Sequence, residues 1–328
     1  MRAVVLGAGA VGSRAARQLA SSDEFDRLLI CDRLTERADM VASSLGPIAA
    51  VGGWDAELFT AADVVVAAAP GTVPLVRAAL ERGIPAVSVA DDVDDVEALL
   101  DMDELARGQG VAVVVGAGMA PGLTCVLARH AGARFSSVEE VHVAKAGTGG
   151  PACARQHQRA LSDEAIDWRD AAWVHRRGGS GRELCWFPDP VCGRDCFRAG
   201  LPDALLLVPA FPGVSRVTAR VAASRRDRLA AVVPTLRRPH RDDEVGAVRV
   251  EVRGQRSGRQ DVEILGVIDR PAVAAGGVAA VAAIWAASGR LARSGAAGLA
   301  EMVTSPADFL AELARRGVKA AVFEGAQN

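Results

Sequence analysis

Short apolar runs alternate with amphipathic segments over the first 116 residues of the chain. The runs are rich in valine and alanine, and most of them end at Gly, Asp or Pro. Runs of this length and composition predict strands that are buried on both faces, and the segments between them predict helices. The predicted strands lie at 2–6, 28–31, 48–51, 63–69, 86–90 and 111–115, and the predicted helices at 13–20, 73–81 and 94–107.

This alternation predicts an α/β fold for the first part of the chain, with a doubly wound parallel (Rossmann) sheet. The pattern changes after Gly116, and residues 152–200 show only weak periodicity. Later segments alternate between apolar and polar positions, as is typical of antiparallel strands with one solvent-facing side. The predicted elements are a helix at 121–131, strands at 138–144, 214–222, 247–253 and 261–268, and helices at 272–288 and 305–315. We therefore predict a second, α+β domain with a mixed or antiparallel sheet.

The length of 328 residues suits two domains, since domains average roughly 150 residues. We place the first domain at 1–120 and the second at 121–299. Half of the residues are hydrophobic and 24% are charged, which is an ordinary globular composition and excludes a disordered chain. The formal net charge of −2 lacks the basic excess typical of nucleic-acid-binding proteins, so we expect no nucleic-acid partner.

The number of cysteines and the longest uncharged segment bear on the cellular location of the protein and on membrane association. Six cysteines in a chain of this length do not resemble the disulfide framework of a small secreted protein, so we predict a cytoplasmic location. Residues 272–289 carry no charge, but alanine and glycine dominate them. The segment is also shorter than the ~20 residues that span a bilayer. We interpret it as a buried helix and expect no membrane association.

Three glycines near the N-terminus form a dinucleotide-binding pattern. Gly7, Gly9 and Gly12 fit G-x-G-x-x-G, with Ala10 and Val11 inside the pattern. The pattern follows a predicted strand and opens a predicted helix, which is the context that the function requires. The first glycine suits a tight turn, the second the close approach of a diphosphate, and the third close helix–strand packing. The first N–H groups of the helix would then bind the phosphates.

The second predicted strand ends in an acid that indicates the choice of cofactor. Asp32 lies 20 residues after the last glycine of the pattern, the spacing of the carboxylate that binds a ribose 2′-hydroxyl. It favours NAD, because it would repel a 2′-phosphate. Arg33 and Arg37 lie close by in the sequence and keep NADP open as the alternative. Pro70 and Gly71 end the fourth predicted strand, and the topology predicts that their loop borders the nicotinamide side of the cofactor.

A more specific motif follows the sixth predicted strand. Residues 113–131 read VVVGAGMAPGLTCVLARHA, in which Gly118, Pro121 and Gly122 form G-x-x-P-G before a helix. The segment resembles the strand–loop–helix signature of the saccharopine dehydrogenase-like reductases, a family that includes lysine 6-dehydrogenase-like enzymes. Further similarity follows in the family's order at 138–151, 250–289 and 305–318. The remaining middle part, 152–246, matches loosely, and we expect it to determine the substrate.

The resemblance implies a division of labour between the domains. The first domain would bind the cofactor, with Gly118 and Pro121 among the residues near it. The second would bind the substrate and supply a dimer surface, and a C-terminal helix within 300–328 would pack back on the first. The implied chemistry is hydride transfer between a nicotinamide and a C–N bond of an amino acid or opine. The chain would then be a homodimeric NAD(P)-dependent oxidoreductase that acts on CH–NH or CH–NH2 donors.

Amine oxidation needs a base, and its reversal needs an acid. Lys145 is one of only two lysines in the chain and ends a predicted strand. His157 follows the Gly147–Pro151 turn, and Asp189 lies in an irregular stretch where it would orient a base or bind an amine. A solvated lysine, a packing histidine and a surface aspartate are the plainer alternatives. We nominate Lys145, His157 and Asp189 as catalytic.

The loop-rich middle of the chain also offers groups that bind anions or metals. An arginine recognises a carboxylate through its planar fork, so we nominate Arg155, Arg194 and Arg198 for the substrate. Cysteines and histidines between residues 153 and 196 include zinc-ligand types. They lack paired Cys-x2-Cys knuckles, and we predict no metal site.

Two other functions stay open at this stage. A non-catalytic NAD(P)-binding sensor or regulatory protein needs the glycine motif but no acid or base. A reductase of C=O or C=C bonds needs the same hydride geometry as an amine dehydrogenase. Cofactor turnover with amines separates both from the favoured function.

Overall fold

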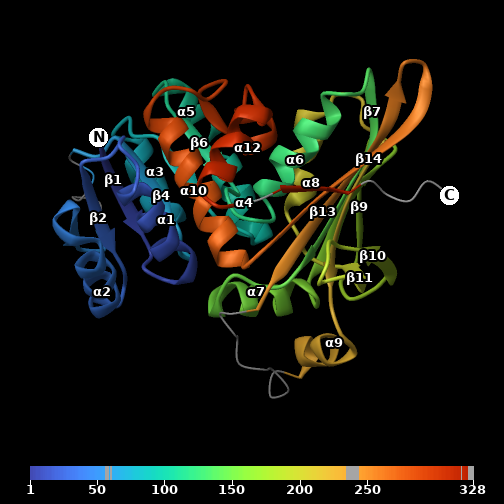
Figure 1. Cartoon of the computed structure of the whole chain (residues 1–328), viewed down its shortest axis with the longest axis horizontal. Coiled ribbons are helices and arrows are strands. Elements are labelled where there is room, and N and C mark those ends of the chain that lie inside the picture. The colour runs from blue at the N-terminus through green and yellow to red at the C-terminus, as the bar shows by residue number, and fades with distance from the viewer. Residues whose placement is uncertain (56–58, 60, 234–243, 319, 324–328) are drawn as a thin grey trace. The chain divides into compact units, whose positions relative to one another are not determined.

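The computed structural model describes residues 1–55, 59, 61–233, 244–318 and 320–323. The chain forms two compact units, which Figure 1 shows with their elements labelled. The first unit contains Met1–Ala90, Asp94–Leu123 and Ala272–Ser305, and the second contains Asp91–Val93, Thr124–Pro271 and Pro306–Asn328. The chain therefore passes from one unit to the other several times.

A seven-stranded sheet forms the centre of the first unit, in the order β15-β6-β5-β4-β1-β2-β3. Every neighbouring pair of strands in it is parallel. The strands are β1 (Arg2–Leu6), β2 (Arg27–Cys31), β3 (Ala49–Gly52), β4 (Val64–Ala67), β5 (Ala86–Ser88), β6 (Ala112–Val115) and β15 (Gly295–Gly298). The six predicted strands are all present, and the predicted doubly wound parallel sheet is confirmed.

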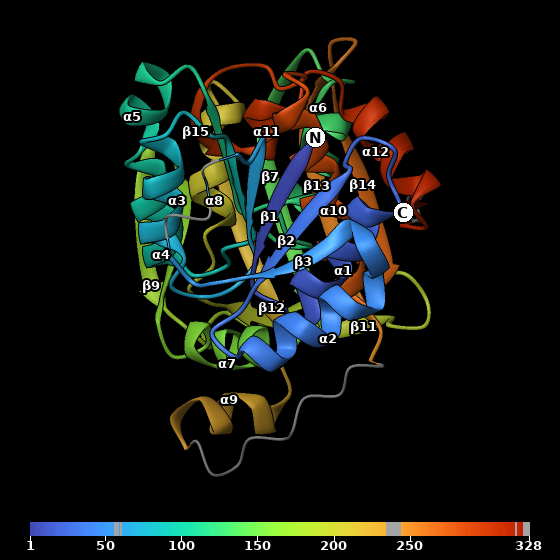
Figure 2. The same cartoon turned by 90° about the vertical axis from the view of Figure 1, so that its left-hand side faces the viewer.

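Helices cover both faces of this sheet. Figure 2 shows α3, α4 and α5 on one side of it and α1 and α2 on the other. The sequence pattern did not predict α2. The helices are α1 (Ala10–Ala20), α2 (Thr35–Leu45), α3 (Val73–Leu80), α4 (Val93–Leu100), α5 (Asp103–Gly108), α10 (Pro271–Ala287) and α11 (Leu299–Met302). Burial on both faces explains why β4 and β6 are apolar throughout rather than alternating.

The carboxyl ends of the central strands lie level with one another. Leu6, at the end of β1, pairs with Cys31 of β2 on one side and with Ala67 of β4 on the other. The chain builds β2 and β3 on one side of β1 and then returns to build β4, β5 and β6 on the other. The strand order thus reverses between β1 and β4. Doubly wound proteins bind ligands outside the carboxyl edge at such a reversal.

The C-terminal third of the chain divides between the two units. Most of α10, together with β15, belongs to the first unit, whereas α12 (Pro306–Arg315) and β16 (Ala320–Phe323) belong to the second. Strand β15 reads GAAG and has no β-branched residue, so its sequence carried no strand signal. It nevertheless pairs with β6, and β16 pairs with β14 of the second sheet. The C-terminal helix is therefore grouped with the second unit, and its packing on the first domain stays a prediction.

The uncharged segment forms α10, which packs within the first unit. A Cβ at Gly276 would lie 2.7 Å from the Cβ of Arg14, so this glycine permits close packing against α1. Val278, Val281 and Ile284 are all buried, as expected for a helix that is apolar all round. Across the described residues, none of the helices combines the length and the apolarity needed to cross a membrane.

A nine-stranded sheet forms the second unit. Its main path runs β10-β11-β12-β7-β13-β14-β16, and β8 pairs with β12 and β9. Strands β7 and β12 are parallel, and the other pairs are antiparallel. The strands are β7 (Ser137–Ala146), β8 (Glu164–Arg169), β9 (Ala172–Arg177), β10 (Glu183–Trp186), β11 (Gly193–Arg198), β12 (Arg216–Ala222), β13 (Gly246–Arg256) and β14 (Arg259–Asp269), besides β16. The predicted mixed sheet is confirmed.

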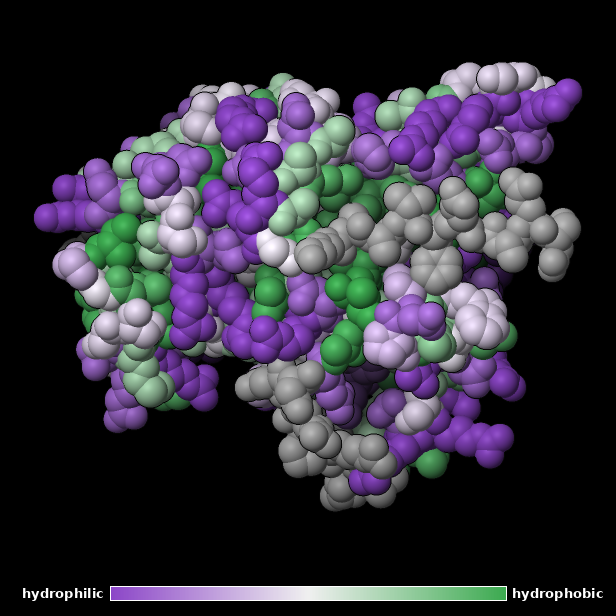
Figure 3. Space-filling model, in the orientation of Figure 1, coloured by the Kyte–Doolittle hydropathy of each residue, from purple (hydrophilic) through white to green (hydrophobic). Residues whose placement is uncertain are grey.

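Helices and polar side chains complete the second unit. Its helices are α6 (Leu123–Gly132), α7 (Pro151–Ala160), α8 (Asp203–Leu207) and α9 (Arg225–Val232), besides α12. The weakly periodic segment 152–200 contains α7 and the strands β8 to β11. Figure 3 shows hydrophilic residues over the outer end of the β13–β14 hairpin, where Arg253 and Arg259 are exposed. Strand β7 lies in the middle of the second sheet, between β12 and β13, and Lys145 lies near its carboxyl end.

Candidate functional site

The glycine loop between β1 and α1 is closed tightly by main-chain packing. Gly7 has a φ of +108°, a conformation that side chains with a Cβ rarely adopt. A Cβ at Gly7 would also lie 2.8 Å from the carbonyl oxygen of Ala68, and one at Gly12 would overlap the carbonyl oxygen of Gly7. These two glycines are therefore required by the fold of the loop, as the motif predicted.

Gly9 differs from the other two glycines because it faces open space. A Cβ placed there would meet nothing within 4 Å. Gly9 is also the N-cap of α1, and a glycine has no side chain that could satisfy the first N–H groups of the helix. The loop thus leaves a space open beside the first N–H groups of α1, and any side chain at position 9 would fill it. This geometry fits a dinucleotide diphosphate.

Asp32 holds the glycine loop through its carboxylate. Oδ2 accepts a hydrogen bond of 2.7 Å from the N–H of Ala8, and Oδ1 accepts one of 2.9 Å from the N–H of Leu34. A carboxylate oxygen accepts more than one hydrogen bond, so both oxygens still have capacity for a ribose hydroxyl. The predicted acid therefore lies beside the glycine loop.

Arg33 connects the loops that follow β2, β3 and β4. Its guanidinium donates a hydrogen bond of 3.1 Å to the carbonyl oxygen of Pro70 and lies 5.4 Å from the ring centre of Trp54. Gly71 has a φ of +72°, and a Cβ there would lie 2.8 Å from Nη2 of Arg33. The structure therefore brings Arg33, Pro70 and Gly71 together at the carboxyl edge of the sheet.

The G-x-x-P-G motif forms a compact main-chain loop at the end of β6. The N–H of Gly118 donates to the carbonyl oxygen of Pro121 at 2.9 Å, and the carbonyl oxygen of Gly118 accepts from Leu123 at 2.9 Å. A Cβ at Gly122 would overlap the main chain of Gly118. The loop is also tied to β5, because Ala117 donates to the carbonyl oxygen of Ser88 at 2.7 Å. The close main-chain contacts of the loop explain why residues 118 and 122 are glycines. The cofactor role of Gly118 and Pro121 stays a prediction.

In the second unit, four titratable side chains respond to the charge of Lys145. They are Asp91, Cys153, His157 and Asp203, and for each of them the Lys145 ammonium lowers the pKa. Lys145 lies near the end of β7, and Cys153 and His157 lie one turn apart on α7. Asp203 begins α8, and Asp91 belongs to the short stretch 91–93. Lys145 is therefore the shared cation of the cluster.

Both carboxyls of the cluster are harder to ionise than usual. Burial raises the pKa of Asp203 above its ordinary value of 3.8, although Lys145 and a hydrogen bond from Thr124 oppose the rise. That bond joins Oγ1 of Thr124 to Oδ1 of Asp203 over 3.0 Å, and both residues are fully buried. Burial also raises the pKa of Asp91, and the neighbouring charge of Asp92 adds to the rise. Burial thus disfavours the ionised form of both carboxyls.

His157 and Cys153 are uncharged members of the cluster. Burial, together with the Lys145 charge, lowers the pKa of His157 to about 4. Burial, together with the Asp91 charge, raises the pKa of Cys153 to about 12. Near neutral pH the imidazole is therefore uncharged and able to accept a hydrogen bond. The sequence nominated Lys145 and His157, and the structure brings these two together.

The imidazole of His157 is expected to stay neutral far below the ordinary value of 6.5, because burial and Lys145 both oppose its charge. An NMR titration of the histidine side chains measures this, with His157→Gln assigning the resonance. Since the folded-state pKa is depressed, His157 makes the fold less stable as pH falls from 6.5 through about 4. His157→Gln should remove that part of the acid sensitivity. A His157 resonance that titrates near 6.5 contradicts the buried environment.

Asp203→Asn is expected to stabilise the protein near neutral pH by on the order of 1 kcal/mol. Asparagine keeps an oxygen for Thr124 and removes a charge that burial disfavours. Because the folded-state pKa is raised, the wild-type penalty is largest at neutral pH. It disappears as pH falls below 3.8, where the carboxyl is protonated in both states. Urea unfolding at several pH values measures the difference. A stability loss in Asp203→Asn at neutral pH contradicts this prediction.

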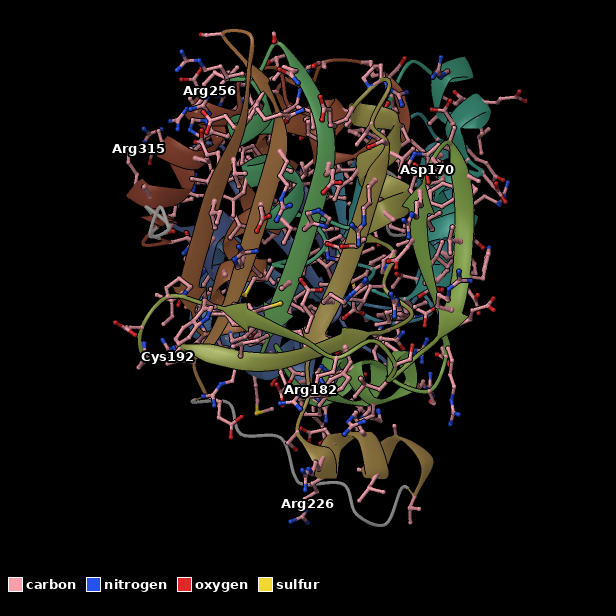
Figure 4. All side chains as sticks on the ribbon, turned by 90° about the vertical axis from the view of Figure 1, so that its right-hand side faces the viewer. Asp170, Arg182, Cys192, Arg226, Arg256 and Arg315 are labelled. Atoms are coloured by element: carbon pink, nitrogen blue, oxygen red, sulfur yellow. The ribbon has the colours of Figure 1, made fainter. Side chains whose placement is uncertain are left out.

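Asp189 lies apart from Lys145, on the β10–β11 hairpin. It is exposed, and its Oδ1 accepts a hydrogen bond of 3.0 Å from the thiol of Cys192. Figure 4 shows Cys192 at this hairpin. Asp189 does not appear among the charges that act on the Lys145 cluster. The structure therefore does not bring this nominated catalytic residue to Lys145 and His157.

The three nominated arginines lie in different surroundings. Arg155 is exposed on α7, the helix that carries Cys153 and His157. Arg194 is exposed on β11, and Nε of Arg198 lies 3.5 Å from Oδ2 of Asp167. Among the three, only Arg155 shares an element with the Lys145 cluster.

The cysteines and histidines between residues 153 and 196 include zinc-ligand types, and we predicted no metal site there. Within the residues that the structure describes, no group of three or more His, Cys, Asp or Glu side chains is placed to hold a metal ion. Cys153 and His157 instead belong to the Lys145 cluster. Sequence reasoning missed Asp91, Asp203 and Thr124, of which only Asp91 carried a signal, as an acid directly after a predicted strand.

Comparison with solved structures places the whole chain in a known fold, although no family model matches it. Saccharopine dehydrogenase (L-Glu forming) from Saccharomyces cerevisiae, in its apo form, has a TM-score of 0.72 at 13% identity. The match covers 98% of this chain and 100% of that one. DAP dehydrogenase from C. glutamicum, in complex with DAP, has a TM-score of 0.51 at 16% identity, with 97% and 99% covered. GenD2 from gentamicin A biosynthesis, in complex with NAD, has a TM-score of 0.50 at 14% identity, with 99% and 97% covered. The chain has the fold of saccharopine dehydrogenase over nearly its whole length, as the sequence resemblance implied.

Proposed function

We propose that the protein is an NAD(P)-dependent oxidoreductase of the saccharopine dehydrogenase-like family. It would transfer a hydride between the nicotinamide and a C–N bond of an amino acid or opine-like substrate. The observation that carries the proposal is the glycine loop, in which Gly7 and Gly12 are packed closed while Gly9 stays open beside the first N–H groups of α1. The likeness to saccharopine dehydrogenase and DAP dehydrogenase supports the C–N bond.

The chain's own residues would select and orient the cofactor. Gly7, Gly9, Ala10, Val11 and Gly12 would hold the diphosphate through their main chain. Asp32 would accept hydrogen bonds from the adenosine ribose, which favours NAD, because a 2′-phosphate would meet its carboxylate. One N–H of the Arg33 guanidinium donates to Pro70, and its remaining donors keep NADP as the alternative cofactor. When bound, the nicotinamide supplies the hydride acceptor or donor.

Lys145 and His157 would move the proton that accompanies hydride transfer. Oxidation of an amine to an imine removes a hydride from carbon and a proton from nitrogen, and one of these two side chains would accept that proton. His157 is uncharged near neutral pH, because its pKa is lowered to about 4, so it is available as an acceptor. Arg155, on the same helix as His157, is our first choice for the substrate carboxylate, followed by Arg194 and Arg198. Asp189 is retained as a catalytic proposal of lower rank.

The proposal extends to the assembly and location of the protein. A cytoplasmic homodimer suits a chain with six free thiols and the dimer surface that the resemblance implies. Small molecules, and not nucleic acids or membranes, would be its partners. Sedimentation analysis tests the dimer directly, because a monomeric protein at micromolar concentration contradicts it.

Calorimetric titration with NADH and NADPH, followed by an absorbance assay, tests the proposed function. We expect NADH to bind in the micromolar range and more tightly than NADPH. We then expect reduction of NAD⁺ with one or more members of a panel of amino acids and opines. Binding without turnover on this panel favours a cofactor-binding sensor, and turnover with alcohols or enones alone favours a C=O or C=C reductase. Absence of binding to either dinucleotide overturns the proposal.

A further inference from the structure

The glycine loop lies between the residues that follow β2 and those that follow β4. On the β2 side, the N–H of Ala8 donates a hydrogen bond of 2.7 Å to Asp32. On the β4 side, a Cβ at Gly7 would lie 2.8 Å from the carbonyl oxygen of Ala68. The end of β1, with the loop that follows it, is therefore flanked by the segments that follow its two neighbouring strands.

Arg33 reaches over the end of β1 from one of these sides to the other. It follows Asp32 on the β2 side, and its Nη2 donates a hydrogen bond of 3.1 Å to the carbonyl oxygen of Pro70 on the β4 side. Strands β2 and β4 have β1 between them, and two strand spacings amount to about 10 Å. The side chain of Arg33 therefore crosses the end of β1, just outside the glycine loop.

Two neighbours keep the guanidinium of Arg33 in this position. The ring centre of Trp54, which follows β3, lies 5.4 Å from its central carbon, a distance at which an aromatic ring attracts a cation. Gly71 has no side chain to obstruct it, since a Cβ there would lie 2.8 Å from Nη2 of Arg33. In the described part of the chain, such a Cβ would meet no residue within 4 Å other than Arg33 and the chain neighbours of Gly71. A side chain at position 71 would therefore displace the guanidinium.

The position of Arg33 conflicts with a bound dinucleotide. Doubly wound proteins bind nucleotides outside the carboxyl ends of the strands where the strand order reverses, and here the order reverses between β1 and β4. We propose that Arg33 is a strap that closes the cofactor site of the free protein, and that its bond to Pro70 opens before the dinucleotide enters. This inference rests on the proposed function and adds a conformational step to cofactor binding. Association is then slowed in proportion to the fraction of molecules in which the strap is open.

Stopped-flow fluorescence of NADH binding tests the strap. Arg33→Ala removes it, and we expect the association rate constant to rise about five-fold or more, because a hydrogen bond and a cation–π contact no longer hold the site closed. Salt at about 0.5 M screens the general attraction between the protein and the anionic cofactor. Gly71→Ala keeps the charge of Arg33 but displaces its guanidinium, so it is expected to raise the rate constant too.

Two control variants separate the strap from general effects. Arg77→Ala removes an exposed arginine of α3, and Gly83→Ala places a side chain at a similar φ of +69°, where its Cβ would lie 4.0 Å from Oε1 of Gln109. Both should keep the wild-type rate constant. The inference is overturned if Arg33→Ala associates no faster than Arg77→Ala, or if Arg33 still donates to Pro70 in a crystal structure of the NADH complex. Those results leave the oxidoreductase proposal standing, whereas a wild type that does not bind NADH removes both.

Discussion

Gly9→Ala is expected to weaken NADH binding by at least about 100-fold, close to 3 kcal/mol, without lowering the stability of the protein. The added methyl group meets nothing within 4 Å in the chain itself. It therefore costs the fold nothing, but it occupies the space through which a diphosphate would approach the N–H groups of α1. Calorimetry with NADH and urea unfolding measure the two effects separately.

Gly12→Ala, in the same loop, is expected to lower both binding and stability. Its Cβ would overlap the carbonyl oxygen of Gly7, and forced overlap in a packed region costs typically 1–3 kcal/mol. Gly108→Ala is the control, since Gly108 lies in α5 and also faces open space. It should leave NADH affinity unchanged. If Gly9→Ala binds NADH as the wild type does, the glycine loop is not the diphosphate site.

The glycine loop was predictable because its chemistry is local. A strand, a turn of three glycines and a helix follow one another within 20 residues. Gly7 and Gly12 each meet a steric demand of their neighbours, whereas Gly9 leaves a space open. The position of Asp32 followed from the same logic, because adjacent parallel strands end level and Asp32 comes directly after β2. Sequence order was sufficient wherever consecutive elements pack side by side.

Sequence patterns carried no signal where distant segments meet. Strand β15 adds to β6 although about 180 residues separate them, and its sequence, GAAG, resembles a turn more than a strand. Strand β15 is grouped with the first unit, whereas β16 pairs with β14 and is grouped with the second. Neither pairing leaves a periodic signal.

The Lys145 cluster shows the same limit at the level of chemistry. Lys145 and His157 were nominated because lysine and histidine are rare in this chain and follow predicted elements. Asp203 was not, because an aspartate at the start of a short helix is an ordinary helix-starting residue. Only the fold brings it next to Thr124, 79 positions away, and into the field of Lys145. Asp189 had the right chemistry in the sequence, but the fold places it beside Cys192.

Lys145→Met is expected to lower kcat by about 10²–10⁴-fold, the usual contribution of a general acid or base, while NADH affinity stays within a factor of about two. The variant removes the cation that acts on four neighbours, so their pKa values should change together. The pKa of His157 should rise from about 4, because Lys145 lowers it, and the pKa values of Asp91 and Asp203 should rise further. Steady-state kinetics with the identified substrate and the histidine NMR titration measure the two effects.

Lys145→Arg separates proton transfer from charge. Arginine keeps the positive charge near Asp91 and Asp203, but it does not lose its proton in proteins. The variant should therefore keep the low pKa of His157 and the stability of the wild type, and lose kcat as Lys145→Met does. If Lys145→Arg retains full activity, Lys145 serves the cluster as a fixed charge and His157 carries the proton. If Lys145→Met also retains it, neither role belongs to Lys145, and the acid–base assignment passes to His157 alone.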